Sequence, residues 1–182
     1  MSGTQILVAY GTKHGSTREV ADAVAETLQE LGLDVDTLPA SRVDDVSPYA
    51  GVVLGGALYM GRWHPDAVEF LEQHRHVLAT MPVAVFGMGP RTMAEHDAEA
   101  SKAQLVKALA NVPEVDPYAV AVFGGVIDPH TLHFPFNRLP ASDARDWDAI
   151  RSWATEVAGV FDYGKAAPDA RDPRSELQQS PR

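Results

Sequence analysis

The stretch TQILVAYGTKHGSTREVADAVAETLQEL, residues 4–31, combines three local patterns in the order that decides the fold. Residues 4–10 form a short, mostly apolar run, which indicates a strand buried on both faces. Residues 16–31 carry apolar side chains at helical spacing and are followed by Gly32, so they predict a helix with a glycine stop. The connecting residues 11–17 hold two glycines, three hydroxyl side chains and no acid.

The rest of the chain repeats this alternation of strand and helix. Further strands are predicted over residues 33–38, 52–57, 82–88 and 118–123, and further helices over residues 65–79, 94–110 and 146–161. Such alternation implies a parallel sheet with helices on both faces. The second strand alternates polar and apolar residues, as an edge strand does. We therefore predict an α/β fold with a doubly wound five-stranded parallel sheet in the order 2-1-3-4-5.

Composition and charge limit the cofactors, partners and cellular location that are expected for this chain. The chain has 182 residues, no cysteine and a formal net charge of −10. The absence of cysteine excludes disulfides and iron–sulfur clusters held by this chain. The acidic balance disfavours a nucleic-acid partner. No apolar run approaches the roughly 20 residues of a transmembrane segment, and no export signal opens the chain, so a cytoplasmic protein is expected.

Two segments fall outside the repeating pattern. Residues 126–144 are predicted to be a loop, which holds His130, His133, Phe134, Phe136 and Arg138. Residues 164–182 are rich in Pro, Asp, Arg, Ser and Gln, which is typical of a disordered tail. The expected organisation is thus one domain over residues 1–163 and a C-terminal tail over residues 164–182.

The loop after the first strand has the features of a phosphate site. In parallel α/β sheets, ligands bind at the carboxyl ends of the strands, and a helix start offers free amides and the positive end of the helix dipole. Gly11 and Gly15 allow close backbone approach, and Thr12, Ser16 and Thr17 add hydroxyl groups. The alternative is that Ser16 or Thr17 only caps the helix.

Three common phosphate-handling loops do not match. A Walker loop needs a lysine after its last glycine, and here Ser16 follows Gly15. The dinucleotide fingerprint G-x-G-x-x-G does not fit the spacing of Gly11 and Gly15. A receiver domain, which shares the topology, needs acidic residues after the first strand and an aspartate at the end of the third, and the chain has neither.

What remains is a loop of the form T-x-x-G-x-T-x-x-x-A, spelled by Thr12, Gly15, Thr17 and Ala21. In this the sequence resembles the flavodoxin family. The resemblance implies a flavodoxin-like fold and FMN as cofactor. It assigns the FMN phosphate to the first loop, with Thr12, Lys13, His14, Gly15, Ser16 and Thr17 as cofactor-binding residues.

A flavin also needs walls for its ring, and the loops after the third and fourth strands open on the same rim. The expected wall residues are Ala57, Leu58, Tyr59, Met60, Gly61 and Trp63 in the first of these loops, and Gly87, Met88 and Gly89 in the second. Tyr59 and Trp63 could each stack on the isoalloxazine, and the sequence does not choose between them. A peptide flip at Gly61 could tune the flavin potential, and Arg91 either reaches the site or is solvated.

A narrower resemblance rests on three segments: TREVA at residues 17–21, VVLGGALYMGRWHPDAVEF at residues 52–70, and DWDAIRSWATEVA at residues 146–158. These are similar to the bacterial menaquinone-dependent protoporphyrinogen oxidases of heme biosynthesis. The resemblance covers about residues 5–87 and 118–160. It implies an FMN-dependent oxidoreductase that passes electrons from a small hydrophobic substrate to a quinone.

The sequence departs from that branch after the fifth strand. The branch has a long basic and aromatic insertion there, whereas residues 126–144 are shorter and hold Arg138 as their one basic residue besides two histidines. This departure and the acidic charge favour the alternative, a non-enzymatic electron carrier that docks on redox proteins. A fold that has lost its flavin is a third hypothesis.

The histidines do not predict a metal site. His74 and His76 stand two apart on a helix and point different ways. His130 and His133 lie in a loop without a cluster of carboxylates. His64 precedes a helix, where it could relay protons or act as a cap. No catalytic residue is assigned from the sequence.

Overall fold

The computed structural model describes residues 5–90 and 94–166, so Arg91 and the residues from 167 onward lie outside the description. Within it, strands and helices alternate as expected. The strands are β1 (Gln5–Gly11), β2 (Asp34–Pro39), β3 (Gly51–Tyr59), β4 (Arg62–Trp63), β5 (Val83–Met88), β6 (Ala119–Phe123), β7 (Val126–Ile127) and β8 (Ser142–Asp143). The α-helices are α1 (Ser16–Glu30), α2 (Pro65–Leu78), α3 (Glu95–Leu109) and α4 (Trp147–Ala166), with short 3-10 turns at Ala40–Arg42, Pro129–Thr131 and Phe136–Arg138.

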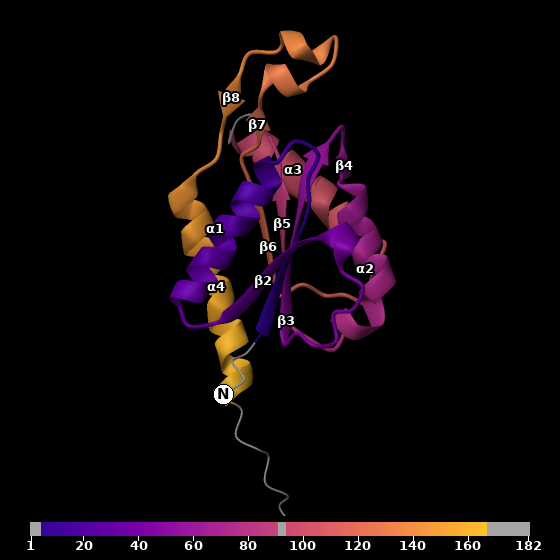
Figure 1. Ribbon diagram of the computed structural model, residues 1–182. Coiled ribbons are helices and arrows are strands. Elements are labelled where there is room, and N and C mark those ends of the chain that lie inside the picture. The colour runs from indigo at the N-terminus through magenta and orange to yellow at the C-terminus, as the bar shows by residue number, and fades with distance from the viewer. Residues whose placement is uncertain (1–4, 91–93, 167–182) are drawn as a thin grey trace, which may run out of the picture.

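The central sheet has the order β2-β1-β3-β5-β6, and all of these strands run parallel (Figure 1). Numbered as parallel strands, this is the predicted order 2-1-3-4-5. The chain therefore turns in opposite directions from β1, to β2 on one side and to β3 on the other. Such a switch point opens a crevice at the carboxyl ends of β1 and β3.

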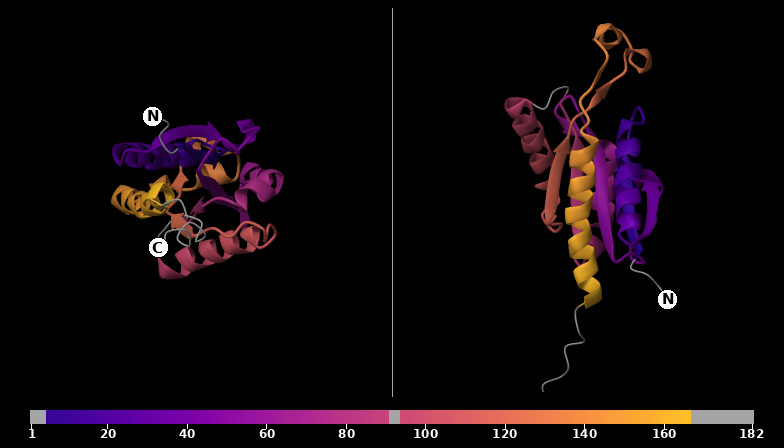
Figure 2. Two further views of the ribbon diagram at one scale, coloured as in Figure 1. Left: turned by 90° about the horizontal axis from the view of Figure 1, so that it is seen from below. Right: turned by 90° about the vertical axis from the view of Figure 1, so that its left-hand side faces the viewer.

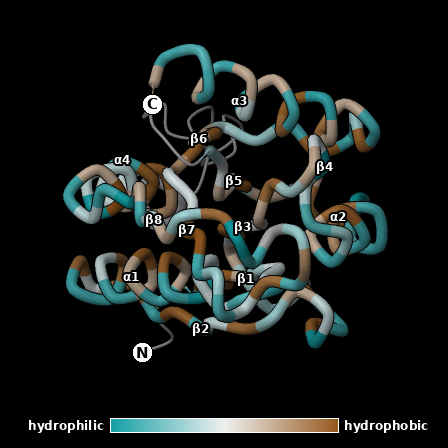
Figure 3. Tube along the Cα trace, turned by 90° about the horizontal axis from the view of Figure 1, so that it is seen from above, coloured by the Kyte–Doolittle hydropathy of each residue, from teal (hydrophilic) through white to brown (hydrophobic). Residues whose placement is uncertain are grey.

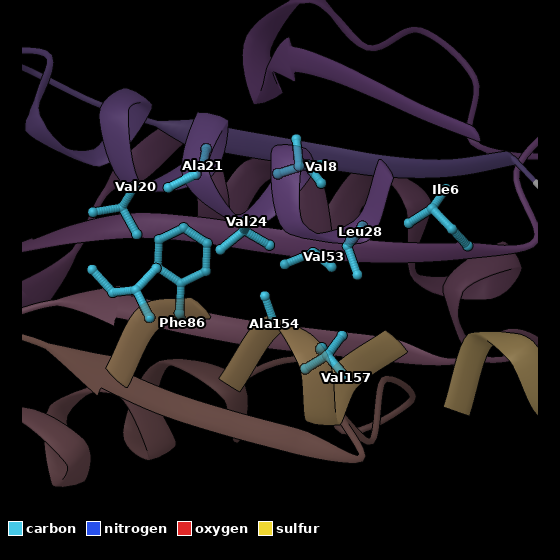
Figure 4. Close-up of a cluster of buried hydrophobic side chains, with 14 of the residues drawn as sticks. Ile6, Val8, Val20, Ala21, Val24, Leu28, Val53, Phe86, Ala154 and Val157 are labelled. Atoms are coloured by element: carbon cyan, nitrogen blue, oxygen red, sulfur yellow. The ribbon is translucent and has the colours of Figure 1, made fainter. Parts of the chain in front are cut away.

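Two apolar layers hold the sheet between helices. Helices α1 and α4 cover one face, and α2 and α3 cover the other (Figures 2 and 3). In the first layer, Val20 and Val24 of α1 lie beside Phe86 of β5, and Leu28 of α1 and Val157 of α4 lie further along the same layer (Figure 4). These side chains are fully or almost fully buried. Burying each such side chain contributes about 1.5–3 kcal/mol, so this layer fixes where α1 begins relative to β1.

The end of β3 differs from the sequence expectation. The strand was predicted to end at Ala57, but it continues to Tyr59 and turns back as β4. Leu58 pairs with Trp63 and Tyr59 with Arg62, which leaves Met60 and Gly61 as a two-residue turn. Both turn residues have positive φ, 48° and 76°, as a type I′ hairpin requires. Met-Gly lacks the Asn-Gly signal of such turns, so the local sequence gave no indication of the hairpin.

Residues 126–143 also contain structure that the prediction of a plain loop missed. Val126 pairs with Asp143 and Ile127 with Ser142, which makes a short antiparallel hairpin with two 3-10 turns beyond it. We call residues 126–143 the arm. The arm extends past the carboxyl ends of the central strands (Figures 1 and 2).

Helix α4 ends later than expected. It continues through Ala166, past the predicted helix end at residue 161 and past the expected domain boundary at residue 163. Gly164 lies within the helix and does not end it. The predicted tail beyond residue 166 lies outside the described residues.

Candidate functional site

A cavity of about 600 Å³ lies at the carboxyl ends of β1, β3 and β5. Its walls come from the β1–α1 loop, the β3–β4 hairpin, the start of α2, the end of β5 and the root of the arm. The residues that line it are Thr12, Lys13, His14, Ser16, Ala57, Leu58, Tyr59, Met60, Arg62, Trp63, His64, Pro65, Met88, Gly89, Gly125 and Val126. The fold thus brings segments that are far apart in the sequence together at the crevice predicted from the strand order.

The β1–α1 loop presents an uncapped helix start to this cavity. Gly15 is the N-cap residue of α1 and has a φ of 91°, which a glycine adopts without strain. No side chain caps the helix, so the alternative in which Ser16 or Thr17 serves as the cap is wrong. The hydroxyl of Thr12 instead accepts a hydrogen bond from the Gly15 amide at 2.9 Å. The first-turn amides of α1 therefore keep their capacity to bind an external acceptor.

Thr17 is the most informative residue of the loop. Its side chain is fully buried, and its Oγ1 atom has no hydrogen-bond partner. Thr27, ten residues later on the same helix, shows the ordinary arrangement, because its hydroxyl donates to the Ala23 carbonyl at 2.9 Å. A buried hydroxyl without a partner costs free energy, about 1–3 kcal/mol. Such an atom at a helix start is available to an acceptor or donor on a ligand.

The β3–β4 hairpin supplies an exposed aromatic ring and a strained turn. The side chain of Tyr59 is 46% exposed, and the ammonium of Lys13 lies 5.1 Å from the centroid of its ring. This cation–π contact joins the β1–α1 loop to the hairpin. Met60 is 76% exposed and holds a positive φ that is unusual for a residue with a side chain. Strain of this kind gathers at functional sites.

Trp63, the second aromatic candidate, is mainly a core residue. It is 3% exposed, and its indole N–H donates to the Gly56 carbonyl at 3.1 Å. It packs against Gly56, where an added Cβ would lie 2.5 Å from the indole nitrogen. Of the two aromatic candidates, Tyr59 is therefore the one whose side chain is exposed enough to contact a ligand.

His64 lines the cavity next to β1. It is the N-cap residue of α2, and its Nδ1 accepts the Asp66 amide at 3.2 Å. Its ring packs on Gly11, where an added Cβ would lie 2.7 Å from Nδ1. Because Nδ1 is an acceptor, a neutral His64 carries its proton on Nε2. The cap role is thus confirmed, and the imidazole also lines the cavity.

Most of the residues predicted as cofactor-binding line the cavity: Thr12, Lys13, His14, Ser16, Ala57, Leu58, Tyr59, Met60, Trp63, Met88 and Gly89. The exceptions are Gly15, Thr17, Gly61 and Gly87. Gly15 and Gly61 have positive φ at turns, and Thr17 is buried in the first turn of α1. Gly87 is covered by Leu58, whose Cδ1 lies 3.0 Å from the place of an added Cβ.

Sequence reasoning missed Arg62, His64, Pro65, Gly125 and Val126 as wall residues. The first three follow the hairpin turn, which the sequence did not indicate. Gly125 and Val126 come after β6 and line the cavity. The backbone of Gly125 lies so close to Gly89 that an added Cβ would be 2.5 Å from the Gly89 carbonyl oxygen. Only a glycine fits this close backbone approach, and a glycine pair after a predicted strand is the one signal that could have marked it.

The cavity is electropositive in an acidic protein. Lys13 and Arg62 line it, and no carboxylate does among the residues that the structure describes. No group of three metal-ligating side chains gathers within residues 5–90 and 94–166. The same described residues include no helix with both the length and the apolar character to cross a bilayer. The arrangement suits an organic ligand with an anionic end and a flat ring.

Comparison with known proteins agrees with this geometry. A family model described as the flavodoxin domain matches residues 7–138. The protoporphyrinogen IX dehydrogenase [quinone] of Escherichia coli (strain K12) is 32% identical over 84 residues, which are 45% of this chain and 46% of the relative. The matched region thus spans about half the length of that relative. The protein of the same name from Leishmania major is 22% identical over 173 residues, covering 85% of this chain and 74% of the relative.

Among solved structures, oxidised flavodoxin 2 from Bacillus cereus superposes with a TM-score of 0.58 at 18% identity and covers 88% of this chain and 99% of its own. This likeness concerns the fold. The family match extends over more than half of the sequence and includes the β1–α1 loop, the β3–β4 hairpin and the end of β5. The chain therefore belongs to the flavodoxin-domain family.

Proposed function

We propose that this chain binds FMN in the cavity at the carboxyl ends of β1, β3 and β5 and works as an FMN-dependent oxidoreductase. The observation that carries the proposal is the buried hydroxyl of Thr17, which has no partner at the uncapped start of α1. A phosphate there would accept hydrogen bonds from this hydroxyl and from the first-turn amides of α1.

The charge around the cavity supports an anionic ligand. The chain has a net charge of −10, yet the described wall contains Lys13 and Arg62 and no acid. A phosphate monoester therefore meets favourable potential locally, although the whole protein repels anions. Thr12 can release the Gly15 amide, its present partner at 2.9 Å, to a phosphate oxygen.

The remaining walls suit a flavin ring. Tyr59 offers an exposed aromatic face, and Leu58, Met60 and Met88 offer apolar or polarisable surface. Bound FMN would supply the capacity to accept and donate electrons. The chain's own residues would hold the phosphate, orient the ring and keep water from it, while the Met60–Gly61 turn sets which peptide group faces the ring.

The names of the relatives, protoporphyrinogen IX dehydrogenase [quinone], suggest a small hydrophobic electron donor and a quinone acceptor for this chain. The arm favours an enzyme, because its root at Val126 lines the cavity and Phe134, 70% exposed, lies further along it. The alternative is an electron carrier that docks on redox proteins, which the acidic surface favours.

Two experiments test the proposal in turn. The purified protein should show flavin absorption, and the released flavin should have the mass of FMN. A colourless protein that takes up no added FMN would contradict the proposal. A steady-state assay with protoporphyrinogen IX and a menaquinone analogue then separates the two functions: turnover supports the enzyme, whereas reduction of partner proteins without turnover supports the carrier.

A further inference from the structure

Glu19 places a negative charge close to the proposed phosphate site. It lies in the first turn of α1, two residues after Thr17, and its amide donates to the Gly15 carbonyl at 3.2 Å. Its position is three residues beyond Ser16, which is about 4.5 Å along the helix axis. A carboxylate there stabilises an empty helix start, but it repels a phosphate dianion bound at the same start.

Arg145 comes from the segment between β8 and α4 and pairs with this carboxylate. Its Nη1 donates to Glu19 Oε2. Its Nε donates to Asp143 Oδ1 at 2.9 Å and its Nη2 to Asp143 Oδ2 at 2.6 Å. The guanidinium lies 4.8 Å from the centroid of the Trp147 ring, and only 11% of the side chain is exposed.

The ion pair between Asp143 and Arg145 shifts the pKa of both groups in favour of their charged forms. Hydrogen bonds from Arg145 hold the pKa of the Asp143 carboxyl below its ordinary value. The same carboxylate, and then Glu19, raise the pKa of the Arg145 guanidinium. Asp143 and Arg145 are therefore charged at neutral pH, and the guanidinium lies between the two carboxyl groups of Asp143 and Glu19.

The other cations near this helix start contact groups other than Glu19. Arg18 lies 3.7 Å from Asp22, and its side chain is 66% exposed, so solvent screens this pair. Lys13 lies over the Tyr59 ring. Among the described residues, Arg145 is thus the poorly exposed cation that contacts Glu19.

We propose that Arg145 is a positioning residue for the flavin phosphate: it neutralises Glu19 and fixes the arm beside the cavity through Asp143. This inference rests on the proposed function. The role of Arg145 in fixing the arm follows from the sheet register, because Asp143 pairs with Val126, which lines the cavity. One guanidinium therefore joins the start of α1 to a cavity wall that is more than a hundred residues away in sequence.

The test compares FMN with riboflavin, which has the same ring and no phosphate. Apo protein is titrated with each flavin, and quenching of flavin fluorescence gives the two dissociation constants. For Arg145→Gln, we expect FMN binding to weaken about three- to tenfold, as for one unit charge within a Debye length. Riboflavin binding should change much less, because the effect acts on the phosphate.

Two further variants separate charge from folding. Glu19→Gln in the R145Q background should recover most of the lost preference for FMN. Glu19→Gln alone, with Arg145 intact, should increase the preference for FMN over riboflavin. Arg75→Gln is the matched control. Arg75 of α2 pairs with Glu114, from the segment after α3, at 3.8 Å, so the substitution removes the same charge away from the cavity.

The outcomes are distinct. If the wild-type protein binds neither flavin, the proposed function fails. If the wild-type protein prefers FMN and R145Q keeps the same preference, the proposed role of Arg145 is wrong. It is also wrong if adding E19Q to the R145Q variant restores none of the lost preference for FMN. If R145Q does not fold, E19Q alone decides, and an unchanged preference for FMN in E19Q overturns the inference.

Discussion

At the scale of the residue, Thr17 and Thr27 form a natural comparison on helix α1. Both are buried, but the Thr27 hydroxyl has a partner and the Thr17 hydroxyl has none. Thr17→Val keeps the shape and removes the hydroxyl. We expect the dissociation constant of FMN to rise at least about tenfold, since a hydrogen bond to a charged group contributes about 1.5–3 kcal/mol.

The apo protein gives the internal check. Thr17→Val should leave the free energy of unfolding of the apo protein unchanged or raise it, because a buried group without a partner is removed. Thr27→Val should leave FMN affinity unchanged. Titration with FMN and urea unfolding measure both quantities. Loss of FMN affinity in both variants, or in neither, would contradict the assigned role of Thr17.

His64 has a stability role that can be separated from its place in the cavity. Its Nδ1 caps helix α2 by accepting the Asp66 amide. His64→Ala should lower the free energy of unfolding by about 1 kcal/mol, the usual cost of a lost N-cap. His64→Asn supplies a side-chain oxygen as acceptor and should recover most of this loss. Urea unfolding measures it, and equal stability of the two variants would show that the cap contributes nothing.

At the scale of the element, the β3–β4 turn carries strain that substitutions can change in either direction. Met60 has a φ of 48° and is 76% exposed, so little apolar burial is lost when it is replaced. Asn-Gly is the preferred type I′ sequence, and Met60→Asn should therefore raise the free energy of unfolding by about 0.5–1 kcal/mol. Gly61→Ala places a side chain at a φ of 76° and should lower it by about 1–2 kcal/mol. Guanidinium unfolding compares them, and a destabilised M60N would contradict the strained turn.

The elements also show what the sequence could predict. The β1 strand, the glycine-rich loop and α1 each have a local signal, namely an apolar run, paired glycines and apolar residues at helical spacing. The site residues next to these signals were predicted for the same reason. The arm was not, because β7 and β8 contribute only two residues each and no alternating pattern. The contacts of His64 with Gly11 and of Arg145 with Glu19 depend on tertiary packing, which no local pattern encodes.

At the scale of the whole molecule, two tyrosines connect separate elements and predict alkaline sensitivity. The Tyr49 hydroxyl donates to Asp36 of β2 at 2.9 Å, and the Tyr118 hydroxyl donates to the Val157 carbonyl of α4 at 2.9 Å. Burial, and then the hydrogen bond to Asp36, raise the pKa of Tyr49 to about 12. Burial also raises the pKa of Tyr118.

The raised pKa values predict that the free energy of unfolding falls as the pH rises. The unfolded-state pKa of tyrosine is about 10, and the folded-state pKa of Tyr49 is higher. The contribution of Tyr49 to the free energy of unfolding is therefore fully present below about pH 10. This stability is lost as the pH rises toward about 12, the folded value for Tyr49. Tyr49→Phe removes this titration, so its free energy of unfolding should fall less steeply with pH in that window. Urea unfolding at several alkaline pH values measures the slopes, and identical slopes would contradict the assignment.

The central claim is that the start of helix α1 binds the phosphate of FMN through the Thr17 hydroxyl and backbone amides. A crystal structure of the FMN complex tests it most directly. We expect a phosphate oxygen within hydrogen-bond distance of Thr17 Oγ1 and of the first-turn amides of α1, with the ring beside Tyr59. A phosphate held elsewhere, with Thr17 still without a partner, would show that this helix start is not the phosphate site.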